Sequence, residues 1–381
     1  MPTVTVPAGT QQATSNDPHH QSTHTDGRDA PRVRWLSTRG GIALAVVVLT
    51  VLLVVSVVVA IGLGSAVVPP SDTARYLWAS VTGGSIPADE STRYQIIWQV
   101  RTPRVLLAVI VGAGLGVVGV VIQAMVRNAL ADPFILGVSS GASVGAVTVG
   151  VFGALATVGI YAVSIGAFLG ALGATLLVFL ISYSRAGVMP LRLVLTGVAM
   201  SFGFQAIMSV IIYFAPSSEA TSTVLFWSMG SFGAATWGAL PVVAIAVAAG
   251  LVVLHRFSRP LDVMALGDET AASLGVDASG VRKVLFALTA VMTGAMVAVS
   301  GAIGFVGLII PHIVRIIVGA SHRRVLTITP FVGAIFMVWV DLVSRTLVAP
   351  RELPLGAITA LVGVPVFITL MRRKSYLFGG R

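Results

Sequence analysis

The sequence contains no cysteine, which excludes disulfides, thiolate metal ligands and cysteine nucleophiles. Charge is also scarce, because Asp, Glu, Lys and Arg make up only 10% of the 381 residues, whereas a soluble domain has about 25%. Hydrophobic residues account for 56% of the chain, and its mean hydropathy is +0.95. An ordinary globular protein is therefore excluded, and we expect the chain to be embedded in lipid.

Lysine is almost as rare as cysteine, and its two positions bear on the energy supply. A P-loop needs the pattern G-x-x-x-x-G-K-[ST], in which the lysine reaches the nucleotide phosphates. Neither Lys283 nor Lys374 follows a glycine in that frame. The chain is therefore not expected to be an enzyme, and any ATP that drives it must be hydrolysed by a separate chain.

Basic residues outnumber acidic ones by 24 to 14, but their positions do not suggest a nucleic-acid surface. They lie at the ends of apolar stretches, where they are typical of topology signals and of contacts with anionic lipid headgroups. Membrane lipids are therefore expected partners, and nucleic acid is not.

Residues 1–38 differ in composition from everything that follows. They are rich in Ser, Thr, Asp, Gln and His and contain almost no apolar run, which predicts a disordered cytoplasmic tail. His19, His20 and His24 could bind a metal, but a solvated tail with incidental histidines is the favoured interpretation. No metal site is predicted, and a transmembrane domain is expected over residues 39–381.

Uncharged stretches divide that domain into membrane spans, each of which needs about 20 residues to cross the hydrocarbon core. Residues 133–184 are uncharged throughout, which is enough for two helices and a turn near Gly153 to Gly159. The other uncharged stretches are 41–63, 105–126, 193–218, 220–254, 284–314, 325–340 and 353–371.

Basic residues at the ends of these stretches indicate which ends are cytoplasmic. Lys283 and Arg323 both lie on the cytoplasmic side by this rule, so two crossings must fit between them. The first takes about 284–302, and the second, 304–318, is so short that it must be a half-length or broken helix packed against protein. The pattern predicts an all-α membrane protein of about ten transmembrane helices with both termini cytoplasmic.

Five motifs follow one another in a recognisable order. They are RTPRVLLAVIVGAGLGVVGVVIQAMVRNALADPFILGVSSGA (101–142), FWSMGSFGAATW (226–237), LDVMALGDETAASLGV (261–276), GAIGFVGLIIPHIVRIIVGASHRR (301–324) and DLVSRTLVAPRELPLGAITALVGVPVFITLMRR (341–373). Together they resemble the signatures of the iron-chelate and cobalamin type of ABC importer permease, over about residues 40–375.

The resemblance implies the type II importer permease fold and a set of partners. It implies a second permease subunit in a homodimer or heterodimer, two cytoplasmic ATPase subunits and an extracytoplasmic substrate-binding protein. ATP and Mg²⁺ would belong to the ATPase, and no cofactor is expected in this chain. The location would be the cell membrane, with ferric siderophore as the leading substrate and haem or cobalamin as alternatives.

An arginine cluster is expected at the outer face. Arg101 and Arg104 are three residues apart where a span begins, and Arg345 lies at the outer end of another. In the family, arginines at these positions dock carboxylates of the binding protein, which suits their bidentate geometry. The alternative is interfacial anchoring of arginines that extend to the headgroups. Asp341, four residues before Arg345, is expected to position it or to pack helices.

The polar stretch 258–281 is expected on the cytoplasmic side. Within it, residues 261–275 are predicted to be one short helix with exposed Asp268 and Glu269, and the resemblance implies that it couples the permease to a groove on the ATPase. The alternative is a solvated connector. The coupling residues expected are Leu261, Leu266, Gly267, Asp268, Glu269, Leu274 and Gly275.

Two further sets of residues take their roles from the resemblance. Asn128 and Leu130 would belong to a cytoplasmic gate, although Ala129 stands where the family usually has Pro; a purely structural turn is the alternative. The translocation path would be lined by small or mildly polar residues, which suits a large chelate better than a naked cation. These are Gly197, Ser201, Gln205, Gly356, Thr359 and Gly363.

Two other classes of protein remain as alternatives. An ion-coupled secondary transporter would need inverted repeats and a carboxylate at the midplane, and Asp341 is too near the surface. A membrane-embedded enzyme would need a constellation of ligands or nucleophiles, and neither His255 nor His312 has a second histidine at ligand spacing. His312 and Gln123 are expected to form contacts between helices.

Overall fold

The computed structural model describes residues 38–64, 68–184, 187–215, 222 and 225–372. The predicted tail lies outside these residues, apart from Thr38. The regular elements of the described part are helices, apart from a two-residue antiparallel ladder between β1 (Tyr183–Ser184) and β2 (Gly187–Val188). The all-α membrane fold is confirmed.

Six helices are long and apolar enough to cross a membrane, and a bent pair makes a seventh span. The six are α1 (Arg39–Gly62), α4 (Thr102–Met125, continuous with the shorter helices before it), α6 (Ala162–Ser182), α7 (Pro190–Tyr213), α12 (Ala278–Ser300) and α14 (His322–Thr346). The pair is α9 (Leu240–Arg256) and α10 (Ser258–Met264), bent by 57°. Three shorter apolar helices, α5 (Val138–Phe152), α13 (Val306–Val318) and α15 (Leu355–Arg372), bring the described spans to the predicted number.

Two helices lie between Lys283 and Arg323, as the charge rule predicts. α12 ends at Ser300, and α13 has 13 residues, a length of about 20 Å at 1.5 Å per residue. It is too short for the hydrocarbon core of about 30 Å, and it packs against α4, α14 and α15. The predicted half-length helix is therefore confirmed.

Within the uncharged stretch 220–254, the membrane-spanning helix occupies only the second half. Helix α9 begins only at Leu240, and residues 230–239 form an irregular segment. Gly230 has a positive φ of 79°, which ends the short helical turn before it. The segment is held by hydrogen bonds from the Ser231 amide to the Ser300 carbonyl and from the Trp237 indole to the Trp98 carbonyl. Hydropathy alone does not distinguish such an uncharged loop from a helix.

Short helices between α1 and α4 were not predicted. They are α2 (Pro70–Thr82), η2 (Ala88–Glu90), α3 (Ser91–Gln95) and the π-helical η3 (Ile96–Arg101). Arg75 of α2 forms an ion pair with Glu90 at 2.6 Å. Pro70 at the first helical position and Asp72 in the first turn are typical of a helix start.

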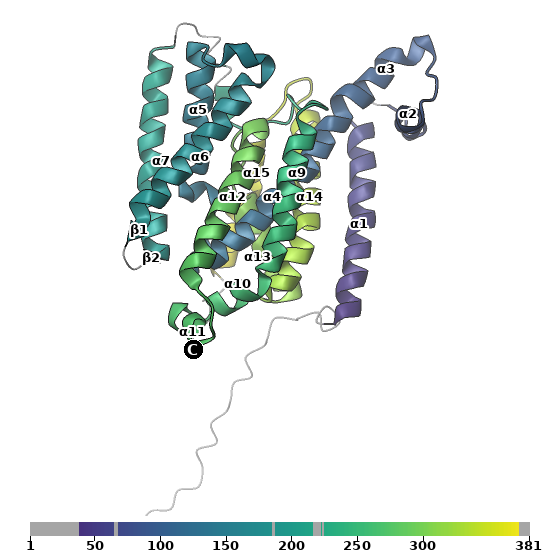
Figure 1. Ribbon diagram of the computed structural model, residues 1–381. Coiled ribbons are helices and arrows are strands. Elements are labelled where there is room, and N and C mark those ends of the chain that lie inside the picture. Colours follow the sequence, from purple (N-terminus) through teal and green to yellow (C-terminus); the bar gives the residue numbers. More distant parts are fainter. Residues whose placement is uncertain (1–37, 65–67, 185–186, 216–221, 223–224, 373–381) are drawn as a thin grey trace, which may run out of the picture. The chain divides into compact units, whose positions relative to one another are not determined.

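Helix α4 forms the centre of the bundle, and it contacts α9, α12, α13 and α14. Figure 1 shows α4 in the middle, α1 at one edge and α5, α6 and α7 grouped at the other. Glycines permit the closest approaches: a side chain at Gly119 would collide with the Gly307 backbone of α13, and one at Gly112 with the Gly333 backbone of α14. Small residues allow this close packing of membrane helices.

Candidate functional site

Two arginines satisfy the carbonyl groups at the outer end of α1. Arg345 Nη1 donates to the Leu63 carbonyl at 2.7 Å, and its Nη2 donates to the Ala60 carbonyl. Arg101 Nη1 donates to the Gly62 carbonyl at 2.9 Å and to the Ile61 carbonyl at 3.2 Å. The last carbonyls of a helix have no partner within it, and positive charge there is favourable. The pair therefore ties α1 to η3 and α14.

Arg104 and Arg345 share a buried carboxylate. Asp341 of α14 has no exposed surface; it accepts from Arg104 Nε at 2.7 Å and from Arg345 Nε at 3.1 Å. The other two guanidinium nitrogens of Arg104 donate to Glu352, at 2.6 and 3.1 Å. The Glu352 side chain is 43% exposed. We call these five residues, Arg101, Arg104, Asp341, Arg345 and Glu352, the outer polar network.

The three arginines lie together, as expected, but their side chains are directed into the bundle, and the docking role that the resemblance implies stays a prediction. Arg101, Arg104 and Arg345 are only 5%, 5% and 7% exposed. The physical reason is the supply of acceptors inside the bundle, four helix-end carbonyls and two carboxylates, which the sequence does not place next to them. The expected contact between Asp341 and Arg345 is confirmed, but the pairings with Arg104 and Glu352 were missed because they join residues far apart in the chain.

The coupling segment is two helices rather than the single helix expected. Helix α10 ends at Met264 and α11 (Asp268–Ser273) follows, with Gly267 between them at φ 113°. That conformation favours glycine. Leu261 is buried, whereas Leu266 and Leu274 are 66% and 59% exposed. Leu261 therefore belongs to the core, which corrects its expected place on a contact surface.

Asp268 was expected to be exposed to solvent, but the structure pairs it with Arg282. Arg282 Nη1 donates to Asp268 Oδ2 at 2.9 Å, and this hydrogen bond is the largest of the influences that lower the pKa of Asp268. The Arg282 side chain is 2% exposed and also donates to the Met125 carbonyl at the end of α4. Glu269 is exposed, as expected. Arg282 thus links the coupling segment to the central helix.

The turn that follows α4 lies beside the coupling segment. Asn128 Oδ1 accepts from the Leu130 amide at 2.9 Å, and both residues are exposed. Arg127, which has a φ of 52°, places its guanidinium against Gly267. Asp132 Oδ1 caps the next turn by accepting from the Phe134 amide at 2.9 Å, and its burial raises its pKa to about 6.

The predicted path residues divide into two groups. Gln205 on α7 is exposed, and Ser201 is half-buried with its hydroxyl bonded to the Gly197 carbonyl. Gly197, Thr359 and Gly363 are buried, and a side chain at Gly363 would meet Phe305 and Ile309. Gly356 packs near the Met229 and Ala302 carbonyls. The buried residues therefore pack against neighbouring helices within the subunit, and the lining role that the resemblance implies stays a prediction.

Two polar contacts link helices inside the bundle. Gln123 Nε2 donates to the Gly307 and Leu308 carbonyls at 3.1 and 3.2 Å, which confirms its expected role between helices. Asp262 of α10 accepts from the His322 amide at 2.8 Å and contacts His322 Nδ1 at 2.7 Å. Sequence reasoning missed this second contact, since 60 residues separate the partners. His312 is buried in α13.

Comparison with known proteins places this architecture among importer permeases. Residues 52–373 match the FecCD transport family. The molybdate import system permease protein MolB of Haemophilus influenzae is 36% identical over 85% of this chain and 94% of its own length. The hemin transport system permease protein HmuU of Yersinia pestis is 38% identical over 79% and 88%.

A third relative and a solved structure extend the comparison. The iron(3+)-hydroxamate import system permease protein FhuB of Bacillus subtilis is 34% identical over 93% of this chain and 89% of its own length. A metal-chelate type ABC transporter, solved in an inward-facing conformation, has a TM-score of 0.75 at 34% identity and covers 86% of this chain and 99% of that chain. These similarities confirm the resemblance that the five motifs indicate.

Proposed function

The chain belongs to the FecCD transport family, and from that premise we propose that it forms the translocation path of an ATP-driven importer for a ferric siderophore. It is a multi-pass membrane protein and a permease subunit of the ABC importer class. The observation that most favours the siderophore is the relative named for iron(3+)-hydroxamate import, which matches over 93% of this chain. Relatives named for hemin and molybdate make these the competing substrates.

We propose that α10 and α11 receive the force from two cytoplasmic ATPase subunits, which bind the ATP and Mg²⁺. Leu266, Leu274 and Glu269 are exposed there, and exposed leucines on either side of the short helix α11 suit a groove on a partner. The Arg282 contacts with Asp268 and with the end of α4 offer a rigid link from this surface to the centre of the bundle. The adjacent turn at Asn128 and Leu130 would then move with it as the cytoplasmic gate.

The second permease subunit would cover apolar surface on α7 and α15. Phe202 and Leu195 of α7 are 68% and 61% exposed, and Leu361 of α15 is 75% exposed. Gln205 lies on the same helix as the first two and is the predicted path residue that this surface would present. A homodimer would place two copies of Gln205 along the path, and a heterodimer only one.

The outer polar network is the proposed docking place for the external binding protein. Glu352 occupies two nitrogens of Arg104 while its own side chain is 43% exposed. A carboxylate of the binding protein would compete with Glu352 for the two terminal guanidinium nitrogens of Arg104. Glu352→Ala should then tighten binding of the cognate binding protein to the reconstituted transporter. Weaker binding would show that Glu352, and not Arg104, contacts the partner.

The function is tested by uptake in a strain that lacks the gene. Radiolabelled iron is supplied as several ferric siderophores, and haem, cobalamin and molybdate are supplied in parallel. Selective loss of one ferric siderophore, restored by the wild-type gene but not by Leu266→Asp, is the expected result. Loss of only haem, cobalamin or molybdate uptake would retain the permease and replace the substrate. Persistence of every uptake, with paralogous importers also removed, would refute the proposal.

A further inference from the structure

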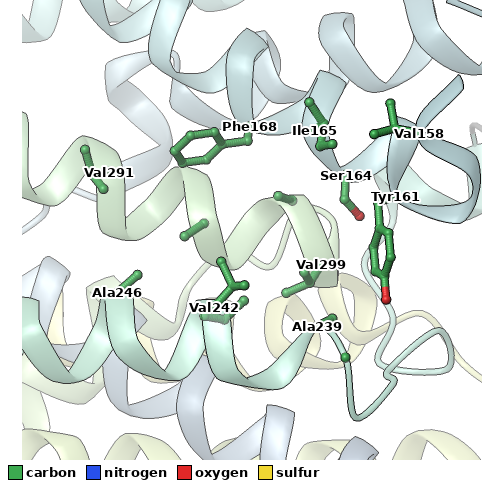
Figure 2. Close-up of a pocket in the computed structure, with 14 residues that line it drawn as sticks. Val158, Tyr161, Ser164, Ile165, Phe168, Ala239, Val242, Ala246, Val291 and Val299 are labelled. Atoms are coloured by element: carbon green, nitrogen blue, oxygen red, sulfur yellow. The ribbon is translucent and has the colours of Figure 1, made fainter. Parts of the chain in front are cut away.

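A cavity of about 530 Å³ lies between α6, α9 and α12. Figure 2 shows Ile165 and Phe168 of α6 on one side of it, Val242 and Ala246 of α9 on another, and Val291 and Val299 of α12 between them. Helices α6 and α9 each pack against α12, and the cavity separates them. None of its lining residues belongs to the outer polar network or to the coupling segment.

The position of the cavity along the helices places it in the outer half of the membrane. Its walls come from the first residues of α6 and α9 and from the last residues of α12. By charge, the cytoplasmic ends are the opposite ones, marked by Arg256 at the end of α9 and by Arg282 and Lys283 at the start of α12. The cavity therefore lies at the depth of outer-leaflet acyl chains.

The chemistry of the lining suits hydrocarbon. Every lining side chain is apolar except those of Tyr161 and Ser164. In Figure 2 these two lie together at the end near Val299, away from Val291 and Ala246, and that end is the outer one. A tyrosine near the membrane surface places its hydroxyl at the headgroup level. The cavity is thus apolar in its depth and weakly polar at its outer rim.

The cavity has apolar surroundings that do not suit a polar ligand. Val242 and Val291 are 68% and 41% exposed, and the nearby Leu169 and Ile245 are 56% and 69% exposed. Water needs two to four polar partners in a buried site, and a ferric chelate would need donors or charges that this lining lacks. Left empty, the walls would lose the dispersion contacts of a close-packed interior.

We propose that the cavity binds one acyl chain of an outer-leaflet phospholipid, with its ester region at Tyr161 and Ser164. The acyl chain fills the space between α6 and α9 that no side chain fills, so the lipid is a structural ligand that completes the packing of these helices. Because the competing environment is also lipid, its binding comes from van der Waals contacts with the cavity walls and not from removal of hydrocarbon from water.

The test uses the full-length protein in nanodiscs of phosphatidylcholine that contains a photoreactive diazirine in the acyl chain. After illumination, labelled peptides are identified by mass spectrometry. Peptides with residues 161–168 and 239–246 should be labelled more heavily than the lipid-exposed face of α1, which serves as the reference for ordinary boundary lipid.

The matched variants are Ala246→Phe, which fills the cavity from α9, and Ala249→Phe, an exposed position on the same helix outside the lining. Ala246→Phe should lose the extra labelling of residues 161–168, and Ala249→Phe should keep it. If Ala246→Phe fails to assemble, Val299→Phe fills the same space from α12. Labelling equal to that of α1, or unchanged in the filled variant, would overturn the proposal. Crosslinks between two copies at α9 would assign the cavity to a second subunit instead.

Discussion

The buried carboxylate of Asp341 pairs with two guanidinium groups that are shielded from water. It contacts Arg104 and Arg345, and the remaining nitrogens of Arg345 satisfy α1 carbonyls. A buried ion pair adds little net stability against a hydrophobic replacement, but the loss of one partner leaves a buried charge uncompensated. The importance of each arginine is therefore expected to be structural as well as functional.

Arg345→Met is expected to destabilise the subunit by about 3–5 kcal/mol, the usual cost of breaking a buried pair. It leaves Asp341 with Arg104 alone and removes two donors from the end of α1. The measurement is the free energy of unfolding in mixed micelles, or the thermal midpoint in detergent. The control is Arg351→Met, an exposed neighbour, which should be nearly neutral. Equal stability of the two variants would contradict the structural role.

Asp132 should make stability depend on pH. Burial raises its pKa from 3.8 to about 6 in the folded protein, so its favourable contribution is present below pH 3.8 and is lost as the pH rises through 6. Asp132→Asn should retain the cap at Phe134 and be more stable than wild type at pH 7, by up to about 3 kcal/mol at 1.36 kcal/mol per pKa unit.

The measurement for Asp132 is the thermal midpoint of both proteins from pH 4 to pH 8. The difference should close as the pH falls from 6 towards 4. Asp277→Asn, which alters an exposed carboxylate that caps α12, provides the comparison. A difference for Asp132→Asn that stays constant over this range would show that its carboxyl does not titrate there.

At the scale of elements, the leucines of the coupling segment have two different roles: one stabilises the fold, and two are available to contact the ATPase. Leu261 packs in the core while Leu266 and Leu274 project outward. Leu266→Asp is expected to abolish uptake and ATPase stimulation without lowering the thermal midpoint, because an exposed side chain adds little to stability. Leu261→Ala should cost about 2–5 kcal/mol of stability, as core truncations do. Loss of stability in Leu266→Asp would assign that residue to the fold instead of the ATPase surface.

The contact between α4 and α13 depends on the absence of a side chain. Gly119→Ala should separate the two helices and destabilise the protein by about 1–3 kcal/mol, the range for overpacked cores. Gly203→Ala on α7 has open space around it and should be neutral or slightly stabilising. Comparing the thermal midpoints of the two variants tests the close packing, and a neutral Gly119→Ala would mean that the helices can move apart without loss.

At the scale of the whole molecule, α4 connects the two functional ends. Its outer end leads into the outer polar network through Arg104, and its inner end meets Arg282 of the coupling segment. Few residues of α1, by contrast, are buried, and its outer carbonyls connect it to the network. A rigid central helix joined at both ends is the arrangement that our proposed coupling of ATPase movement to the outer face requires.

The sequence by itself determined the membrane class, the number of spans and the family. These follow from local quantities: the length of uncharged stretches, the side on which arginines gather, and motifs such as 101–142 that are contiguous in the chain. The short helix α13 was predictable because Lys283 and Arg323 must lie on one side, which is a counting argument and needs no contacts.

Only the tertiary structure decided what the polar side chains touch. Arg104 meets Glu352 across 248 positions, and Arg282 meets the Met125 carbonyl across 157. A guanidinium that reads as exposed in the sequence becomes buried when carbonyls and carboxylates from other helices surround it. The physical reason is that the partners of a buried charge come from distant parts of the sequence. The length of an apolar stretch and the topology of the spans, by contrast, depend on residues that are close together in the chain.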